Sequence, residues 1–194
     1  MDEQNEMSRP NAEQLNEEIR RLQRRKFIFQ SVRNSLGMLV VIAAVVTLVF
    51  TLWLPVMQVQ RGSMTPTLKD GDIIVFMSGA AIKHGDIIAF QHGNQVLIKR
   101  VIAVGGDIVD IDDDGMVLLN GEQLDEPYIT AFSAGERGTE MPCQVEDNQF
   151  FVLGDHRQTS IDSRSVDIGL VRRDQIVGKA LIRVWPPNTI SILA

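Results

Sequence analysis

The chain has 194 residues, of which 44% are hydrophobic and 23% charged, and its formal net charge is −6. This composition fits one globular domain with an additional element, and it excludes a disordered or collagen-like chain and a large multidomain assembly. Residues 1–57 contain seven Lys/Arg and six Asp/Glu, whereas residues 58–194 contain twelve and nineteen, a net charge of −7. Nucleic acid is therefore not an expected partner.

Residues 36–57, LGMLVVIAAVVTLVFTLWLPVM, are almost entirely apolar. At about 1.5 Å per residue, such a helix is about 33 Å long and can cross a hydrocarbon core of about 30 Å. A core helix rarely stays apolar on every face for this length. A cleavable signal peptide would have a shorter apolar region followed by small residues, but this segment ends in Leu-Pro-Val-Met. We therefore predict an uncleaved transmembrane signal anchor over residues 36–57.

Basic residues precede the apolar segment: Arg20, Arg21, Arg24, Arg25, Lys26 and Arg33. By the positive-inside rule, they keep the N-terminus in the cytoplasm. The chain is then a single-pass protein with residues 1–35 as a cytoplasmic tail and residues 58–194 as an extracytoplasmic domain.

The tail has a pattern of its own. Apolar residues recur at helical spacing: Leu15, Ile19, Leu22 and Phe29. This spacing predicts an amphipathic helix, either continuous with the membrane helix or bent from it. Lys26 and Arg33 fall on the same stripe, which favours a solvated or surface-lying helix over a coiled coil.

After Val59, short runs rich in Val and Ile alternate with Gly and Asp: 70–76, 84–90, 95–104, 106–111, 115–121, 149–155, 175–185 and 189–193. Their length and β-branched content favour strands, and the Asp-Gly, Gly-Gly and Asn-Gly dipeptides between them favour turns. We predict a mainly β domain with an irregular excursion over residues 122–148.

Two residues of this domain could form a catalytic pair. Ser63, in the segment RGSMTPTL, would be an ordinary turn residue if it acted alone. In the run VLIKRVI, strand alternation puts Lys99 and Arg100 on opposite faces, so one of them is expected on the core face. If that residue is Lys99, burial lowers its pKa and its amine can activate Ser63 as a general base. Otherwise Lys99 lies in water and Arg100 is buried against Asp155 or Asp162.

A dense polar segment, GDHRQTSIDSR at residues 154–164, follows an apolar strand. It is either a solvated loop or a shell whose hydrogen bonds orient a buried base. The histidines, His84, His92 and His156, have no metal-ligand spacing, and the single cysteine, Cys143, can form neither an intramolecular disulfide nor a CxxC site. No metal site is therefore expected.

The apolar anchor, SMTPTL, KRVIAVGGD, GDHRQTSIDSR and a C-terminal strand follow one another in this order. Together they resemble the type I signal peptidases of bacteria, membrane-bound serine proteases that release secreted proteins from their signal peptides. The resemblance covers about residues 36–185. It implies a mainly β, signal-peptidase-like catalytic domain preceded by one N-terminal transmembrane helix, on the outer face of the bacterial plasma membrane.

The resemblance also implies the partners. The substrates are secretory preproteins with small residues at the first and third positions before the cut, bound as an extended strand at a sheet edge. An apolar surface of the domain dips into membrane lipid, and the reaction needs no metal or other cofactor.

The site residues follow from the resemblance position by position. Ser63 matches the nucleophile, and its backbone N–H matches one oxyanion donor. Lys99 matches the general base, and Ser160 matches a hydroxyl that hydrogen-bonds the lysine amine. The remaining matches are a supporting polar pair, Asp162 and Arg164, a structural salt bridge, Arg100 and Asp155, and substrate-binding residues, Met64 and Pro66.

Arg61 departs from the family pattern. Some members have a hydroxyl side chain at this position, two residues before the nucleophile, that assists the oxyanion. A backbone group or Arg61 itself could take over that role.

Two other functions compete with signal peptide cleavage. An inactive homologue that binds exported chains would have no need of both Ser63 and Lys99. A self-cleaving repressor is disfavoured by the anchor and by the lack of a DNA-binding element, whereas a processing enzyme of a conjugation or pilus system stays open. We predict a membrane-anchored serine endopeptidase with a Ser-Lys dyad that cleaves signal peptides after small residues.

Overall fold

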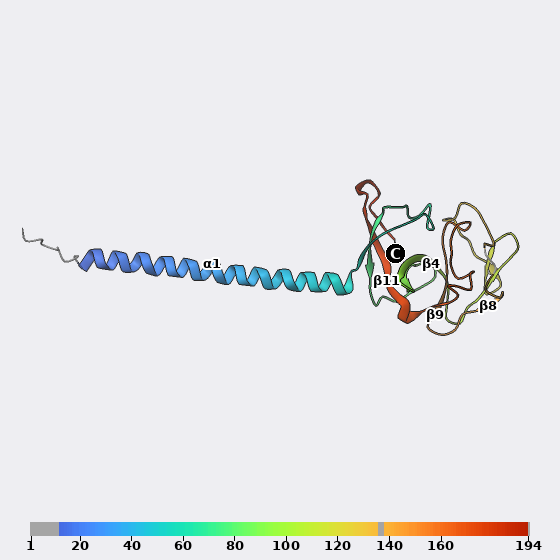
Figure 1. Ribbon diagram of the computed structural model, residues 1–194, viewed down its shortest axis with the longest axis horizontal. Coiled ribbons are helices and arrows are strands. Elements are labelled where there is room, and N and C mark those ends of the chain that lie inside the picture. Colours follow the sequence, from blue (N-terminus) through green and yellow to red (C-terminus); the bar gives the residue numbers. More distant parts are fainter. Residues whose placement is uncertain (1–11, 136–137, 194) are drawn as a thin grey trace, which may run out of the picture. The chain divides into compact units, whose positions relative to one another are not determined.

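The computed structural model describes residues 12–135 and 138–193. The chain divides into two compact units, one that ends at Leu48 and one that begins at Val49. The first unit contains most of helix α1, Ala12–Trp53, and the second contains the strands (Figure 1).

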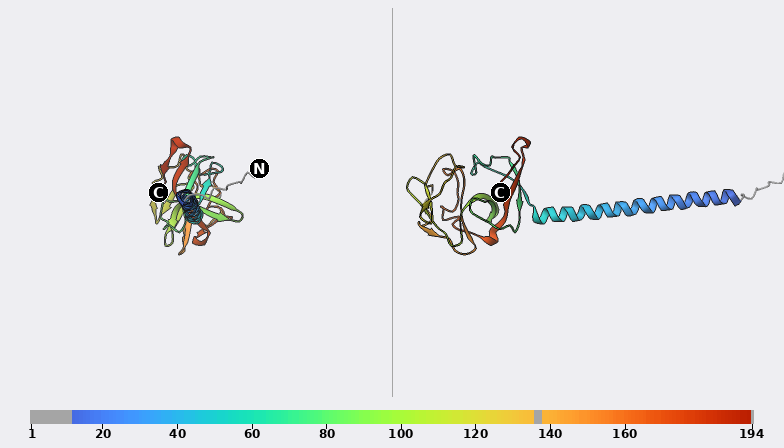
Figure 2. Two further views of the ribbon diagram at one scale, coloured as in Figure 1. Left: turned by 90° about the vertical axis from the view of Figure 1, so that its left-hand side faces the viewer. Right: turned by 180° about the vertical axis from the view of Figure 1, so that it is seen from behind.

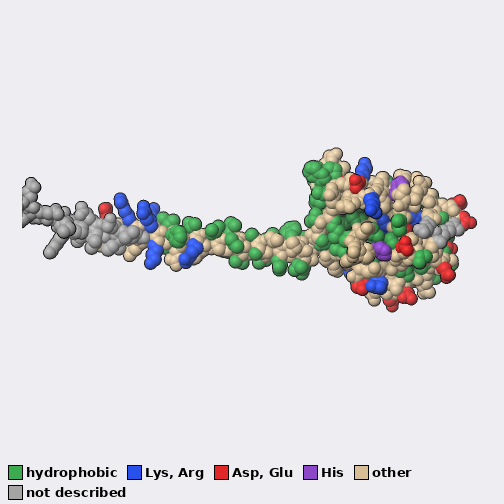
Figure 3. Space-filling model, in the orientation of Figure 1, with side chains coloured by type: hydrophobic (Ala, Val, Ile, Leu, Met, Phe, Trp, Pro, Cys, Tyr) green, Lys and Arg blue, Asp and Glu red, His purple; other side chains and the backbone are tan. Residues whose placement is uncertain are grey.

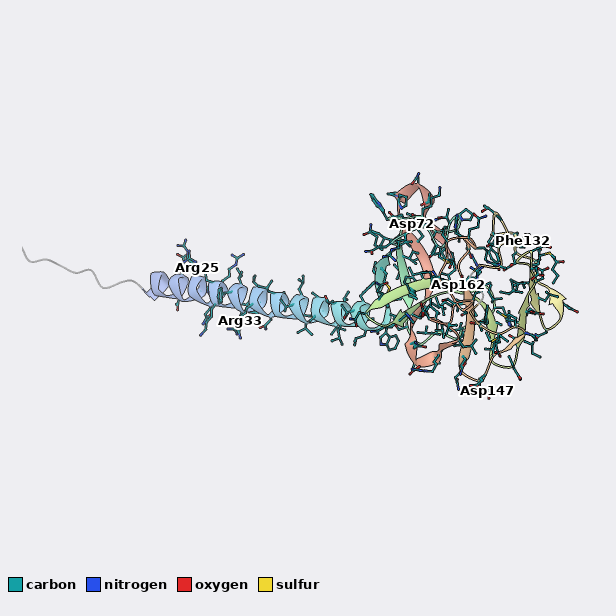
Figure 4. The ribbon with its side chains drawn as sticks, turned by 45° about the vertical axis from the view of Figure 1, so that its right-hand side comes forward. Arg25, Arg33, Asp72, Phe132, Asp147 and Asp162 are labelled. Carbon is teal, nitrogen blue, oxygen red and sulfur yellow. The ribbon has the colours of Figure 1, made fainter. Side chains whose placement is uncertain are left out.

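Helix α1 is one uninterrupted helix of 42 residues, so the described part of the tail is continuous with the apolar segment. Its stretch Gln23–Trp53 is long and apolar enough to cross a membrane, with a mean hydropathy of 2.6. Figure 3 shows basic side chains near the start of the helix and apolar ones along the rest, and Figure 4 labels Arg25 and Arg33 among the former. The side chains of Leu15, Ile19 and Leu22, on which the amphipathic pattern depends, lie outside the described residues.

The helix ends before the predicted boundary. It stops at Trp53, and Val56–Gln58 form strand β1 instead of the last turn of a helix that reaches Met57. Pro55 is the physical reason, because it has no N–H to donate and disfavours the helical conformation of the residue before it. The carbonyl groups of Trp53 and Pro55 accept hydrogen bonds from the N–H groups of Ser78 and Phe76.

The larger sheet has eight antiparallel strands in the order β1-β2-β11-β3-β4-β9-β10, with β12 on β11. Their bounds are β2 Ile73–Met77, β3 Ile87–His92, β4 Gln95–Val104, β9 Gln149–Leu153, β10 Val171–Arg172, β11 Ile176–Trp185 and β12 Ser191–Ile192. Strand β4 lies between β3 and β9 and carries Lys99.

The smaller sheet has four strands in the order β7-β6-β5-β8. Their bounds are β5 Ile108–Ile111, β6 Val117–Leu119, β7 Glu122–Gln123 and β8 Cys143–Gln144. Figures 1 and 2 show β8 at the end of the domain away from β11. Two short 3-10 helices, η1 Arg173–Gln175 and η2 Pro187–Thr189, complete the described elements.

The mainly β prediction is confirmed, because each of the eight predicted runs contains a strand. Strands β7 and β8 lie inside the excursion predicted to be irregular, and β10 also lies outside the predicted runs. These three strands have only two residues each, too few for an alternating pattern to be recognised in the sequence.

Strand β4 contributes to all three hydrophobic clusters of the domain. Ile98 packs against the first, Ile102 belongs to the second and Val101 to the third. Both faces of this strand are therefore covered, although it carries two neighbouring basic residues.

An apolar projection connects β11 with β12 (Figures 1 and 2). Its large exposed side chains are Val184, Trp185, Ile190 and Ile192, and Figure 3 shows apolar atoms gathered there. Trp185 is 52% and Ile192 76% exposed. Large apolar side chains grouped in this way typically mark an interaction surface.

Candidate active site

Ser63 lies in a tight turn that follows β1. The N–H of Thr65 donates to the carbonyl of Gly62, and the N–H of Leu68 donates to that of Met64. Met64 and Leu68 are buried in the first cluster and anchor the turn, whereas Ser63 is only partly buried. The turn therefore holds the serine hydroxyl at the surface of a well-packed core.

Lys99 reaches this hydroxyl from β4. Its Nζ donates to Ser63 Oγ over 2.9 Å, and the residue is only 3% exposed. Burial lowers the pKa of Lys99 from 10.5 to about 8, although the negative charge of Asp162 acts in the opposite direction. The pair thus consists of a nucleophile and a base that can lose its proton near neutral pH.

Both basic residues of β4 are shielded from solvent. Lys99 is buried, as one of the two alternatives required, and Arg100 pairs with Asp155, as the other required. Arg100 Nε and Nη2 donate to Asp155 Oδ1 and Oδ2 over 2.8 and 2.6 Å, so the structure brings together the two residues of the predicted ion pair. The hydroxyl of Thr67 donates to Asp155 Oδ2 over 2.5 Å. Thr67 lies in the same turn as Ser63, so this network links the nucleophile's turn to β4.

Much of the polar segment 154–164 is a packed shell, and only residues 158, 159 and 161 are exposed. Arg164 Nε and Nη2 donate to the two carboxylate oxygens of Asp162 over 2.8 and 2.9 Å, and both residues are buried. Figure 4 shows Asp162 in the interior of the domain. The N–H of Gly154 donates to Asp162 Oδ2, and the N–H of His156 donates to the carbonyl of Ser63.

Ser160 departs from the predicted arrangement. Its Oγ is buried and has no hydrogen-bond partner among the described residues, so the expected hydrogen bond to the lysine amine is not formed. The amine donates to Ser63 instead. Gly154 explains how close Ser160 comes to the site, because a Cβ at Gly154 would lie 2.2 Å from Ser160 Oγ and 2.5 Å from the carbonyl oxygen of Ser63.

A third ion pair, fully buried, was not predicted from the sequence. Arg157 Nη1 donates to Glu126 Oε2 over 2.9 Å, and its Nη2 donates to Oε1. Tyr128 donates to the same carboxylate, and the Arg100 guanidinium lies 3.9 Å from the centre of the Tyr128 ring. Burial raises the pKa of Tyr128. Glu126 lies in the irregular excursion, 31 residues from Arg157, and carries no sequence signal for this pairing.

A cleft of about 930 Å³ opens beside the serine and the lysine. It is lined by residues 57–64 and 94–99 together with His92, Thr159, Ile161, Asp167 and Ile168. Met64 lines it, but Pro66 does not and is exposed elsewhere, because the turn carries it away from Ser63. A substrate role for Pro66 has no support in this geometry.

One long edge of the cleft is an unpaired strand edge. In β4, residues 95–99 pair with β3 on one side, but pairing with β9 begins only at Arg100. Strand β1, which leads into the other wall of the cleft, is itself the edge strand of the sheet. Among residues 12–135 and 138–193, no group of three or more His, Cys, Asp or Glu side chains could hold a metal ion.

A buried lysine hydrogen-bonded to a serine, in a cleft of a β-rich domain, is an arrangement suited to acyl transfer from a peptide. A sequence model of the family "Signal peptidase, peptidase S26" matches residues 32–185. The chain belongs to this family.

Two curated relatives are also named as signal peptidases. A probable signal peptidase I-2 of Synechocystis sp. is 38% identical over 123 residues, which cover 63% of this chain and 51% of the relative. Signal peptidase IB of Staphylococcus aureus is 36% identical over 144 residues, which cover 64% of this chain and 74% of the relative. The chain thus spans about half to three quarters of these relatives.

A crystal structure of a signal peptidase I from Enterococcus faecalis aligns with 52% of this chain and 97% of its own length. The sequence identity is 29% and the TM-score is 0.42.

Proposed function

We propose that this protein is a serine endopeptidase that cleaves signal peptides with a Ser63-Lys99 dyad. The observation that carries the proposal is the 2.9 Å hydrogen bond between Lys99 Nζ and Ser63 Oγ, made by a lysine whose pKa burial lowers to about 8. Family membership supports the choice of signal peptides as substrates.

The reaction takes place in two halves. Ser63 Oγ attacks the scissile carbonyl while Lys99 takes its proton, and the backbone N–H of Ser63 stabilises the oxyanion. Lys99 then gives this proton to the leaving amine, and an ester with Ser63 remains. In the second half Lys99 removes a proton from water, the resulting hydroxide attacks the ester, and the protonated lysine returns its proton to Ser63 Oγ.

The substrate lies in the cleft as an extended segment. The free edge of residues 95–99 offers backbone N–H and C=O groups to such a segment, as in the binding of a peptide to a sheet edge. Met64, which lines the cleft beside Ser63, is the residue we expect to contact the small side chains before the cut. A processing enzyme of a conjugation or pilus system would use the same machinery on other chains.

Helix α1 serves as the membrane anchor in this proposal. Its apolar stretch supports one span, and the basic residues between Arg20 and Arg33 favour an N-terminus in the cytoplasm. Residues 1–35 then form the cytoplasmic tail, and the catalytic domain from residue 58 lies on the outer face of the plasma membrane. Helix α1 ends at Trp53, about four residues before the end of the span predicted from the sequence.

Cleavage of a model preprotein with alanine at both small-residue positions tests the dyad. We expect the full-length protein in detergent to cut it after the second alanine, and Ser63→Ala and Lys99→Ala each to lose at least about 10⁴-fold in kcat. Lys83→Ala, an exposed lysine outside the cleft, is the matched control and should cleave normally. Cleavage that persists in either dyad variant would sink the proposed mechanism.

The apolar projection is proposed to contact membrane lipid. The chain has two tryptophans, so Trp53→Phe leaves Trp185 as the single fluorophore. In full-length protein reconstituted into vesicles, brominated lipid chains should quench Trp185 fluorescence, because apolar side chains with an indole favour the membrane interface. Trp185 emission that is insensitive to brominated lipid would contradict this contact.

A further inference from the structure

Arg61 is an exposed residue of the cleft wall, two positions before Ser63. Its backbone N–H donates to Asp70 Oδ1 over 2.8 Å, which fixes the start of the turn. The family resemblance assigns no role to an arginine at this position, where some members have a hydroxyl side chain.

The backbone at Arg61 would favour another amino acid. Its φ is +71°, in the left-handed region that glycine adopts freely and asparagine tolerates. The other described non-glycine residues with positive φ are both asparagines, Asn120 and Asn148. The backbone conformation therefore does not explain why an arginine stands at position 61. The reason must lie in what the arginine side chain does.

The guanidinium of Arg61 also differs from the others in the domain. Within residues 49–135 and 138–193, the remaining arginines donate to a carboxylate or a carbonyl: Arg100, Arg157, Arg164, Arg172, Arg173 and Arg183. Arg61 has no such partner in the described part of the chain. It is thus a free bidentate donor next to the nucleophile.

The charge around it points to the class of ligand. Residues 58–194 carry a net charge of −7 and would repel an acidic substrate segment. The charged residues that line the cleft are Arg61, Lys99 and Asp167, and Lys99 is turned toward Ser63. A carboxylate that enters the cleft near the scissile bond therefore has one exposed cation to pair with.

We propose that Arg61 is a specificity-determining residue that favours substrates with an Asp or Glu within two residues of the scissile bond. The inference rests on the proposed function, since it concerns selection among substrates of the same site. An exposed Arg-carboxylate pair raises kcat/KM by about two- to fivefold, and salt screens it.

The test compares peptides that differ by one charge. Asp is placed against Asn at the second position before the cut and at the first two positions after it, with alanine kept at the small-residue positions. The ratio of kcat/KM for the Asp and Asn peptides is measured for the full-length protein, Arg61→Gln, Arg61→Lys and the control Arg172→Gln, an exposed arginine that pairs with Asp174.

At one of the three positions we expect a ratio of about two to five in the parent and in Arg172→Gln, close to one in Arg61→Gln, and partly restored in Arg61→Lys. The parent's ratio should fall at high salt. A ratio that is the same in the parent and Arg61→Gln overturns the inference. That includes an equal loss on both peptides, which would assign Arg61 to the oxyanion. If the parent cleaves neither peptide, the proposed function itself fails.

Thermal unfolding of Arg61→Gly supplies a second readout. Glycine adopts a φ of +71° without strain, so the variant should melt at or above the temperature of the parent. A clear decrease would mean that the arginine side chain holds the turn together, and would overturn a role confined to substrate selection.

Discussion

The basic side chains around the site fall into two groups that have different hydrogen-bond partners. Arg100, Arg157 and Arg164 each meet a carboxylate in a two-point contact. Lys99 lies among them and is buried, and it meets only the hydroxyl of Ser63. The arginines are therefore compensated by carboxylates, whereas burial drives the lysine toward the neutral form that the proposed mechanism requires.

This difference shows how one domain can hold stable ion pairs next to a base with a lowered pKa. Each nearby carboxylate already has a guanidinium partner, so neither Asp155 nor Asp162 forms an ion pair with the lysine. Asp162 still raises the pKa of Lys99 through space, and Arg164 lowers it. The paired arginines thus hold two carboxylates close to Lys99, and neither carboxylate pairs directly with the lysine amine.

The largest stability effect should come from breaking a matched pair. Glu126→Gln leaves the Arg157 guanidinium without its counter-charge, and both side chains are at most 1% exposed. We expect a loss of about 3–5 kcal/mol in the free energy of unfolding, measured by urea denaturation of the full-length protein in micelles. Arg172→Gln breaks a pair whose side chains are 63% and 70% exposed and should cost less than about 1 kcal/mol. Similar losses in the two variants would remove the distinction between matched interior pairs and surface pairs.

Lys99→Met should have the opposite sign. At pH 7 it removes a buried ammonium and should stabilise the fold by up to about 3 kcal/mol, although the proposed mechanism expects the variant to be inactive. The pKa of Lys99 is about 8 in the folded state and 10.5 when unfolded, so between these values the unfolded chain binds the proton more tightly. The stability of the parent therefore rises from pH 8 to 10.5, and the advantage of Met should shrink over this window. A difference that does not vary with pH would refute a desolvated lysine.

The smallest expected effect is a displacement of the pH profile. Because the proposed mechanism requires neutral Lys99, kcat/KM should rise with pH through about 8. Asp162→Asn removes a charge that raises the pKa of Lys99, so the rising limb should move to lower pH, and Arg164→Gln should move it to higher pH. When kcat/KM at pH 7 is divided by the value on the alkaline plateau of the same protein, this fraction should differ by a few-fold between each variant and the parent. Asp174→Asn, on the exposed surface, is the control, and limbs that move in the same direction in both test variants would contradict the assignment.

Much of the fold could be predicted because its long strands carry strong local signals. Alternation in the run at residues 95–104 located β4 and placed Lys99 and Arg100 on opposite faces. The same reasoning expected one of these two residues on the core face but could not say which, and three separate clusters in fact cover β4 from both sides. Long-range packing of that kind leaves no mark on a local pattern.

In the candidate site, the sequence carried more information about which charged residues pair than about individual hydrogen bonds. The structure brings Arg100 together with Asp155, and Asp162 together with Arg164. Glu126 was missed because its partner is remote in sequence, and the hydrogen bond of Ser160 was wrong because it depends on a rotamer and on a distance that no sequence encodes. Pro55 was present in the sequence as a helix terminator, but the continuous hydropathy of residues 36–57 outweighed it.

The contact between the nucleophile's turn and the polar shell has a consequence for timing. The carbonyl of Ser63 is held by the N–H of His156, and the absence of a side chain at Gly154 allows the two segments to touch. These parts of the chain are separated by about ninety residues, so a newly made polypeptide carries both reactive groups long before it can align them. Proteolytic competence should therefore arise late, when the final long-range contacts close, and a partly folded molecule would be harmless to its neighbours.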